Sequence, residues 1–271
     1  MPELPEVETA RRGILRVIRG QSVERVVVRD ARLRWRVPVG LAAALTGQRV
    51  QTVDRRGKYL IFRTAAGAML LHLGMSGSLR FVPADQAPEK HDHIDYVFTT
   101  GMALRFRDPR RFGSVHWTKS DPLQHKLLRH LGPEPLAKDF SGAYLLQRAA
   151  GRRQAIKTFI MDSRIVVGVG NIYASEALFG AGIHPGRAVG RISPERFEAL
   201  AKSIRRVLSA AIRKGGTTLQ DFVNAAGEPG YFSVKLKVYD REGQPCRKCG
   251  AAVRMMRSGQ RSTFYCPVCQ H

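Results

Sequence analysis

The spacing of apolar residues divides the chain into a helical opening and a long strand-rich part. In residues 3–19 apolar side chains recur at a helical spacing that Gly20 ends, so the sequence predicts an amphipathic helix. From about residue 23 to 118 the pattern changes to short β-rich runs separated by glycine and proline. The runs are residues 23–28, 59–63, 69–73, 78–82, 94–99, 103–107 and 114–118. Such runs predict an antiparallel sandwich or barrel.

A segment rich in proline and glycine, residues 131–136, interrupts the strand pattern and predicts a domain boundary. Beyond it the apolar spacing is helical. Ser193 and Pro194 are typical of an N-cap and a first helical residue, and the apolar stripe that follows them continues to Ile212. Another helix is predicted to begin at Asn171, after a turn containing glycine. A chain of 271 residues is long enough for two domains.

The cysteines lie near the end of the chain. The four present form two C-x2-C pairs with sixteen residues between them: Cys246, Cys249, Cys266 and Cys269. This spacing predicts a zinc ribbon in which four thiolates bind one structural Zn2+, with a small hairpin in residues 252–263. A disulfide scaffold would require a secretory signal, and the acidic opening Met1–Glu6 does not resemble one. Thiols kept for zinc indicate a reducing, cytoplasmic setting.

The net charge points to a polyanionic partner. Lysine and arginine number 45 against 22 aspartate and glutamate, which leaves a net charge of +23. Such an excess destabilises a compact chain unless a polyanion compensates it, and it therefore favours nucleic acid as the partner. The basic residues are spread through the sequence and do not form a tail. Because no long apolar run occurs, no membrane span is predicted.

The first residues offer an unusual nucleophile. Removal of Met1 would leave the secondary amine of Pro2 at the chain terminus. A terminal amine has a pKa of about 8, against about 10.4 for lysine, so a much larger share of it is neutral near neutral pH and able to attack a sugar carbon. Glu3 and Glu6 lie three residues apart on one face of the predicted helix. By spacing alone, acidic residues in a first turn usually only satisfy the helix dipole.

Short motifs are spread along the chain in addition to the cysteine pairs. They are residues 1–9, 71–77, 90–93, 108–112 and 167–176. Together they resemble the formamidopyrimidine-DNA glycosylase family, bacterial enzymes that excise oxidised purines. The resemblance implies an α+β fold: an N-terminal antiparallel β-sandwich with an N-terminal helix, and a C-terminal helical helix-two-turn-helix domain ending in a β-hairpin zinc ribbon. The implied divisions are residues 1–131, a linker at 132–137, residues 138–235 and residues 236–271.

The resemblance also implies a reaction. Pro2 would attack C1′ of the damaged nucleotide, and Glu3 would supply the proton that opens the sugar. The base leaves and a cationic imine remains, after which β- and δ-elimination cut the strand on both sides. Glu6 would be a supporting carboxylate. Lys58 would donate a proton or contact the lesion and phosphate, although its position alone is typical of a solvated surface residue.

For DNA binding, the resemblance implies that Met75 and Phe112 fill the hole left by an everted base, while Arg110 bonds the orphaned partner base. By themselves Met75 and Phe112 would more often be core residues. Arg261, near the hairpin tip, would reach the everted nucleotide and assist the later elimination step, although its position alone is typical of a phosphate contact. Further DNA contacts are implied for His91, Arg152, Lys157 and Asn171, and a mobile loop for residues 217–231.

The expected substrate is double-stranded DNA with 8-oxoguanine or a formamidopyrimidine opposite cytosine, and the expected state is a monomer. An enzyme of the endonuclease VIII type is one alternative. It prefers oxidised pyrimidines and typically begins Pro-Glu-Gly-Pro, whereas Leu4 and the pair Arg110 and Phe112 favour the purine branch. A non-catalytic zinc-ribbon protein would fit the charge and the cysteines, but it would leave Pro2, Glu3 and the ordered motifs unexplained.

Overall fold

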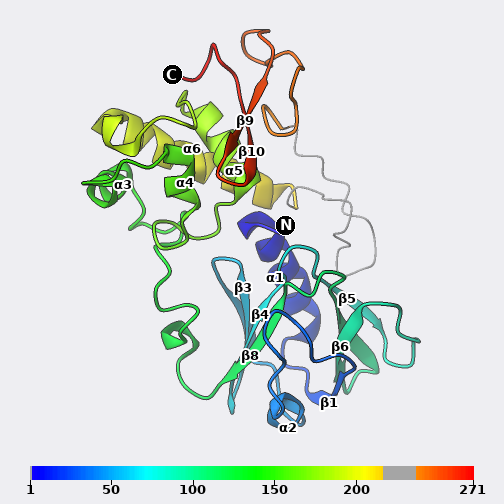
Figure 1. Cartoon of the computed structure of the whole chain (residues 1–271). Helices are drawn as coiled ribbons and strands as arrows, with labels where there is room; N and C mark the ends of the chain where they lie inside the picture. Colours follow the sequence, from blue (N-terminus) through cyan, green and yellow to red (C-terminus); the bar gives the residue numbers. More distant parts are fainter. Residues whose placement is uncertain (1, 216–235) are drawn as a thin grey trace. The chain divides into compact units, whose positions relative to one another are not determined.

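The computed structural model of the chain describes residues 2–215 and 236–271 (Figure 1). The loop expected at residues 217–231 lies outside the described residues. Backbone packing divides the chain into two compact units, one built mainly on the residues up to Arg129 and the other on the residues from His130 onward. Among the described residues, no helix is long and apolar enough to cross a bilayer.

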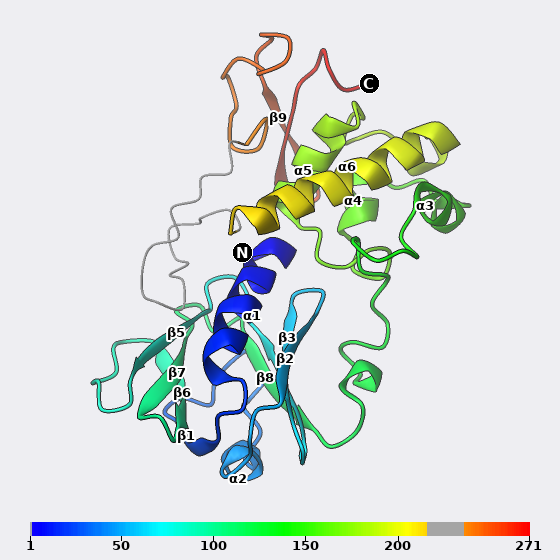
Figure 2. The same cartoon turned by 180° about the vertical axis from the view of Figure 1, so that it is seen from behind.

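Two four-stranded antiparallel sheets form the first unit, in the orders β1-β6-β7-β5 and β2-β3-β4-β8. The strands are β1 (Val23–Val28), β2 (Thr52–Arg56), β3 (Tyr59–Thr64), β4 (Gly67–His72), β5 (Ser78–Pro83), β6 (Asp92–Phe98), β7 (Met102–Arg107) and β8 (Ser114–Thr118). Helix α1 (Leu4–Ile18) lies beside both sheets (Figures 1 and 2), and its Val7, Ile14 and Ile18 share one core with residues of both. The predicted sandwich with an N-terminal helix is confirmed.

All seven predicted strand runs are strands, but the first unit also contains elements that the apolar pattern does not predict. They are strand β2, the short helix α2 (Leu41–Leu45) and the 3-10 helix η1 (Pro122–Gln124). Strand β2 reads Thr-Val-Asp-Arg-Arg, and only Val53 is buried. It therefore lacks the alternation of apolar and polar residues that marks a strand. It is an edge strand of its sheet.

Strand β6 begins at Asp92, two residues before the predicted start, and carries a buried ion-pair network. Asp95 on the same strand receives two hydrogen bonds of 2.8 Å from Arg105, whose side chain is fully buried on β7. Arg105 also lies 3.5 Å from Asp92 and donates to the backbone carbonyls of residues 86 and 87. Because the carboxylates are paired, they are tolerated inside the sandwich. The network also anchors the segment that leads to His91.

The described residues of the second unit form helices followed by a two-stranded hairpin. The elements are α3 (Gly142–Ala149), α4 (Ile156–Met161), α5 (Asn171–Gly180), the 3-10 helix η2 (Val189–Arg191), α6 (Pro194–Arg213), β9 (Arg254–Ser258) and β10 (Arg261–Tyr265). Helices α5 and α6 begin at the predicted residues, and the Ser193 hydroxyl accepts the N–H of Arg196 as the expected cap. Phe179 of α5 and ribbon residues that include Val238 and Phe264 form a small core.

Tyr96 on β6 is a fully enclosed residue of the main core with an unpaired polar atom. It exposes 2% of its surface, and its hydroxyl has no hydrogen-bond partner among the residues that the structure describes. The ring borders a cavity of about 10 Å³ lined by apolar residues such as Phe62 and Met69. Burial raises the pKa of Tyr96 far above its ordinary value. An unpaired buried hydroxyl costs free energy that an apolar ring of the same shape does not.

We therefore expect Tyr96→Phe to leave the free energy of unfolding unchanged or to raise it by about 1 kcal/mol, measured by urea titration. Tyr144→Phe is the matched control, since the Tyr144 hydroxyl donates to the Ile165 carbonyl at 2.8 Å and its loss should cost about 1 kcal/mol. A loss of stability in Tyr96→Phe as large as in the control would show that the Tyr96 hydroxyl has a partner after all.

Candidate active site and DNA-contacting residues

The first turn of α1 is buried together with its carboxylates. Pro2 is buried, and Glu3 and Glu6 expose only 2% and 4% of their surface. Glu3 is the N-cap, and its backbone N–H donates to the Glu6 carboxylate at 2.8 Å within a capping box. Glu6 thus fixes the start of the helix. Glu3, its neighbour in the box, follows directly on Pro2.

One turn further along α1, three arginines donate hydrogen bonds to Glu8. Its carboxylate accepts hydrogen bonds from Arg11 at 2.8 and 3.0 Å, from Arg12 at 2.8 Å and from Arg55 on β2 at 3.1 Å. Burial opposes ionisation of this carboxyl. The hydrogen bonds from Arg11 and Arg12, with the charges of Arg11 and Arg55, outweigh burial and lower its pKa from 4.5 to about 2. Glu8 is therefore ionised at neutral pH and joins the helix to the neighbouring sheet.

Lys58 lies at the tip of the hairpin formed by β2 and β3. Arg56 pairs with Tyr59, so Gly57 and Lys58 form a two-residue turn. Gly57 has φ of +58°, a conformation that turns of this length need and that glycine adopts without strain. The lysine side chain is half-buried.

His72, the last residue of β4, has electrostatic surroundings that suit a functional site. Burial, followed by the positive charges of Lys58 and Arg34, lowers the pKa of His72 to about 4. The ring is therefore neutral at pH 7, and its Nδ1 accepts the N–H of Gly74 at 2.9 Å. The sequence predictions did not include His72, although it belongs to the shared segment 71–77.

The loop after β4 and the loop before β8 are joined to each other. The hydroxyl of Ser76 donates to the Asp108 carboxylate at 2.8 Å, and the same carboxylate accepts the N–H of Gly113 at 2.7 Å. A Cβ atom at Gly74 would lie 2.4 Å from the backbone of Phe112. The two loops can approach this closely only because residue 74 is glycine.

Met75 and Phe112, one on each of these loops, project from the surface. They expose 40% and 43% of their area, so neither is the core residue that its apolar character alone would suggest. The guanidinium of Arg110 lies 4.8 Å from the centre of the Phe112 ring, within the range of a cation–π contact. The structure thus brings these three predicted residues together on joined loops, and their contact with DNA remains a prediction.

His91 is held beside the Arg110 loop in a strained backbone conformation. Its φ is +77°, which is uncommon for a residue with a side chain. Its carbonyl accepts the N–H of Asp108 at 3.1 Å, and the Nε2 atom of buried His93 lies 2.9 Å from the Asp108 carbonyl.

Within the described residues, the cysteines are the one group of three or more side chains placed to bind a metal ion.

Lys157 on α4 and Asn171 at the start of α5 both contact strand β10. Lys157 is 1% exposed, and its ammonium donates to the Thr263 hydroxyl at 2.9 Å and to the Ser262 carbonyl at 3.4 Å. Asn171 donates to the same carbonyl at 3.0 Å. The two residues predicted to clamp phosphate thus support the strand that begins at Arg261. Direct contact of either with phosphate remains a prediction.

An open cavity of about 540 Å³ lies between α4 and the hairpin tip, with Lys157, Arg164 and Arg261 among its lining residues. Arg261 is exposed and follows a two-residue turn in which Gly259 has φ of +59°. Arg152 is half-buried, with its guanidinium 6.0 Å from the Phe159 ring centre. Lys157 is buried and Arg164 is paired with Asp162, which also lines the cavity, so the exposed Arg261 is the cation of this lining that best suits a phosphate.

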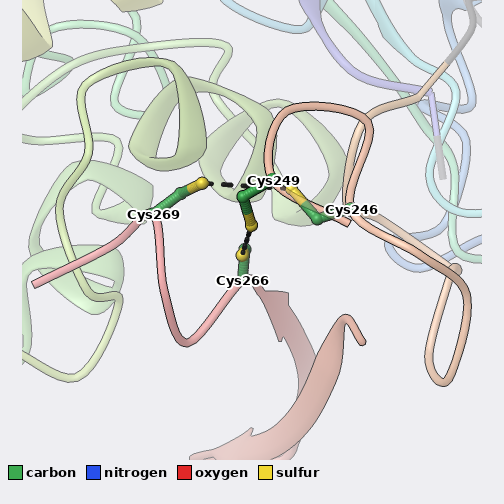
Figure 3. Close-up of side chains that lie close together, drawn as sticks. All are labelled: Cys246, Cys249, Cys266 and Cys269. Atoms are coloured by element: carbon green, nitrogen blue, oxygen red, sulfur yellow. Dashed lines mark hydrogen bonds between the residues drawn. The ribbon is translucent and has the colours of Figure 1, made fainter. Parts of the chain in front are cut away.

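The four cysteines converge from two turns of the ribbon (Figure 3). Their sulfur atoms all lie within 4.8 Å of one another, with 3.5 Å between Cys249 and Cys266 and 4.0 Å between Cys246 and Cys269. Four thiolates bound tetrahedrally to zinc at about 2.3 Å would be about 3.8 Å apart. Thiolate donors also select zinc over hard cations such as Mg2+. The residues present therefore fit one structural zinc ion, as the spacing predicts.

Three domain families match successive parts of the chain. The formamidopyrimidine-DNA glycosylase N-terminal domain matches residues 1–115, the formamidopyrimidine-DNA glycosylase H2TH domain matches residues 131–223, and the zinc finger found in FPG and IleRS matches residues 243–271. Their order follows the sandwich, the helices and the ribbon of the fold. The class defined by this combination is a zinc-ribbon DNA glycosylase.

Relatives match over the full chain. Formamidopyrimidine-DNA glycosylases of Syntrophotalea carbinolica and Pseudomonas aeruginosa are 58% and 54% identical over 100% of both chains. The crystal structure of the MutM (Fpg) protein of Thermus thermophilus has a TM-score of 0.88 and 38% identity over 99% of this chain and 98% of that one. A Lactococcus lactis Fpg complex with DNA containing N7-benzyl-Fapy-dG has a TM-score of 0.90 and 33% identity, with 99% of both chains covered.

This chain belongs to the formamidopyrimidine-DNA glycosylase family. Members of the family are DNA glycosylases with AP lyase activity, so the protein is an enzyme of base-excision repair that binds DNA.

Loss of one thiolate should empty the zinc site and unfold the ribbon. We expect Cys266→Ser to lower the zinc content from one ion per chain to near zero, because a structural zinc site supplies much of the folding free energy of so small a module. Elemental analysis measures the zinc, and limited proteolysis after residue 236 reports the ribbon. Val268→Ser, at an exposed position between the two ligands, should retain both. Full zinc content in Cys266→Ser would contradict the four-thiolate assignment.

Proposed function

We propose that this enzyme removes 8-oxoguanine and formamidopyrimidines from duplex DNA, preferentially opposite cytosine, and then cuts the abasic strand. The observation that carries the proposal is the buried start of α1, where Pro2 and the N-cap Glu3 directly precede the helix. A terminal amine beside a carboxylic acid is the pair that imine chemistry at a sugar carbon requires.

The proposed reaction begins once Met1 has been removed. The amine of Pro2 attacks C1′, the glycosidic bond breaks with departure of the base, and Glu3 protonates the sugar ring oxygen as the ring opens. The resulting imine is cationic and acidifies the hydrogen on C2′. Loss of that proton expels the 3′ phosphate by β-elimination, and a second elimination expels the 5′ phosphate. Water then hydrolyses the imine and releases the amine.

Lys58 and Glu6 have supporting roles in this proposal. Lys58 is presented on a tight turn close enough to His72 for its charge to act on that ring, so a positive charge is available for a phosphate or for proton donation. Glu6 accepts the N–H of Glu3 and so fixes the residue that must deliver a proton. This arrangement agrees with the roles expected for both residues.

The exposed group on the joined loops suits an everted lesion. Removing a base from the stack costs a few kcal/mol and leaves a hole. Met75 and Phe112 are apolar, exposed and anchored through Ser76 and Asp108, as a wedge must be. Arg110 lies against Phe112 and can present two N–H groups to the partner base.

The remaining contacts are proposed to bind the DNA backbone. Arg261 would reach the everted nucleotide, and the other proposed contacts are His91, Arg152, Lys157 and Asn171. Solved Lactococcus lactis relatives are complexes with DNA containing Fapy-dG and with DNA containing an abasic site, which supports both the purine substrate and the lyase step.

Since all proposed catalytic groups belong to one chain, we propose a monomer. A reducing cytoplasm suits its zinc thiolates.

Borohydride trapping tests the proposed intermediate. With an 8-oxoguanine:cytosine duplex, processed protein should form a covalent adduct, and Glu3→Gln should lower the single-turnover excision rate at least about 100-fold because the proton donor is lost. Mass spectrometry confirms that Met1 is absent. Glu24→Gln, which removes an exposed carboxylate paired with Arg25, should behave as the unaltered protein. Processed protein that yields no adduct would refute the imine mechanism.

Opposite-base preference tests the role of Arg110. We expect Arg110→Ala to lower the ratio of excision rates for cytosine and adenine partners by about tenfold or more, since one bidentate contact is worth about 1–3 kcal/mol of discrimination. Arg36→Ala removes a charge from an exposed arginine of the same unit and should preserve the ratio. An unchanged ratio in Arg110→Ala would assign the preference to another residue.

A further inference from the structure

Glu8 connects helix α1, which begins just after Pro2 and Glu3, to strand β2, which ends at Arg56 before the turn that carries Lys58. Its carboxylate lies on α1 and accepts the Nε–H of Arg55 on β2 at 3.1 Å. Both side chains are nearly buried, with 11% and 12% of their surface exposed. A second link reinforces the junction, because Arg11 donates to Glu8 and also to the Val53 carbonyl at 3.1 Å. The start of α1 and the β2 strand are thus fixed to each other by charge-assisted hydrogen bonds.

Arg55 extends this connection to the hairpin tip. While its Nε–H bonds Glu8, another N–H of the same guanidinium donates to the Gly57 carbonyl at 2.9 Å. Gly57 is the first residue of the two-residue turn and Lys58 is the second. The planar guanidinium keeps its two donors in a fixed relative direction, so the carboxylate on the helix determines where the turn lies.

We propose that Glu8 and Arg55 are positioning residues that set the place of Lys58 relative to the Pro2 and Glu3 end of helix α1. The proposal rests on the function proposed above, in which Lys58 assists the reaction. Glu8 and Arg55 touch neither substrate nor reacting atoms and act through Lys58.

Arg12 provides an internal comparison on the same carboxylate. It donates to Glu8 at 2.8 Å, as Arg55 does at 3.1 Å, but its side chain is 60% exposed and lies on α1 itself. Arg12 therefore shares the charge environment of Glu8 without continuing to the hairpin. A purely electrostatic role of Glu8 would involve Arg12 and Arg55 alike, whereas a positioning role requires Arg55.

The test compares Arg55→Lys with Arg12→Lys in the full-length zinc-containing protein. Both variants retain the charge, but a lysine at position 55 lacks the fork that spans Glu8 and Gly57. In single-turnover excision of 8-oxoguanine, Arg55→Lys should be slower by about tenfold, with the Kd for the lesion duplex changed less than threefold. Arg12→Lys should match the unaltered protein in both. Thermal melts confirm that each variant is folded at the assay temperature.

A double-mutant cycle then identifies the residue through which Arg55 acts. In a Lys58→Ala background, Arg55→Lys should cause less than a twofold further loss of rate. A tenfold further loss would overturn the proposal, as would equal effects of Arg12→Lys and Arg55→Lys or an unaffected Arg55→Lys.

Two further readouts separate this proposal from the proposed function. Hydrogen exchange of the hairpin residues 53–60 needs no activity and should be faster in Arg55→Lys than in Arg12→Lys; equal exchange in both would overturn the positioning role. Failure of the unaltered protein to form a borohydride adduct would refute the proposed function, whereas a normal adduct with no effect of Arg55→Lys would refute only the positioning role.

Discussion

The burial of the first two turns of helix α1 is the constraint on which the first unit depends. The proposed mechanism requires the terminal amine to lie in a structured site, yet chain ends are usually among the least ordered parts of a protein. Here residues 2–8 are all buried. Apolar Leu4 and Val7 pack inward, and further along the helix the core joins it to both sheets. The sandwich therefore serves as the support for one helix end.

This burial brings three carboxylates inside, and each needs a partner. Glu3 and Glu6 belong to a capping box, so the backbone of the first turn uses their oxygens. Glu8 is bound by arginines from its own helix and from β2. Because removing either side of such a pair would leave a buried charge uncompensated, the local geometry is strongly determined. In the other sheet, the buried carboxylate of Asp95 is likewise paired with Arg105.

Elements with a regular apolar pattern could be predicted from the sequence. Helix α6, with its serine cap and long stripe, and helix α5, after its glycine turn, begin at the expected residues. Strand β2 could not be predicted, because its polar Arg55 is bound by Glu8 of α1, which is distant in sequence. The zinc cysteines could be predicted from spacing alone, since metal geometry limits where four thiolates can occur.

Side-chain exposure at the candidate site was harder to predict, because some apolar residues are exposed and one lysine is buried. Apolar character assigns Met75 and Phe112 to a core, and they are exposed because tightly joined loops carry them outward. A lysine is expected at the surface, yet Lys157 is buried because the hairpin strand β10 supplies Thr263 as its partner. Neither outcome follows from local pattern, since each depends on a segment remote in sequence.

Ion pairs within the fold determine how much of the net charge of +23 is exposed. Many of the acidic groups of the first unit are used inside it, where Glu8, Asp92 and Asp95 neutralise buried or half-buried arginines. The ribbon differs, because Arg254, Arg257 and Arg261 are all exposed. Arginines paired inside the fold contribute to its geometry, whereas the exposed ones remain available to a polyanion. The positive charge exposed at the protein surface therefore depends on where the carboxylates lie as much as on how many arginines the chain contains.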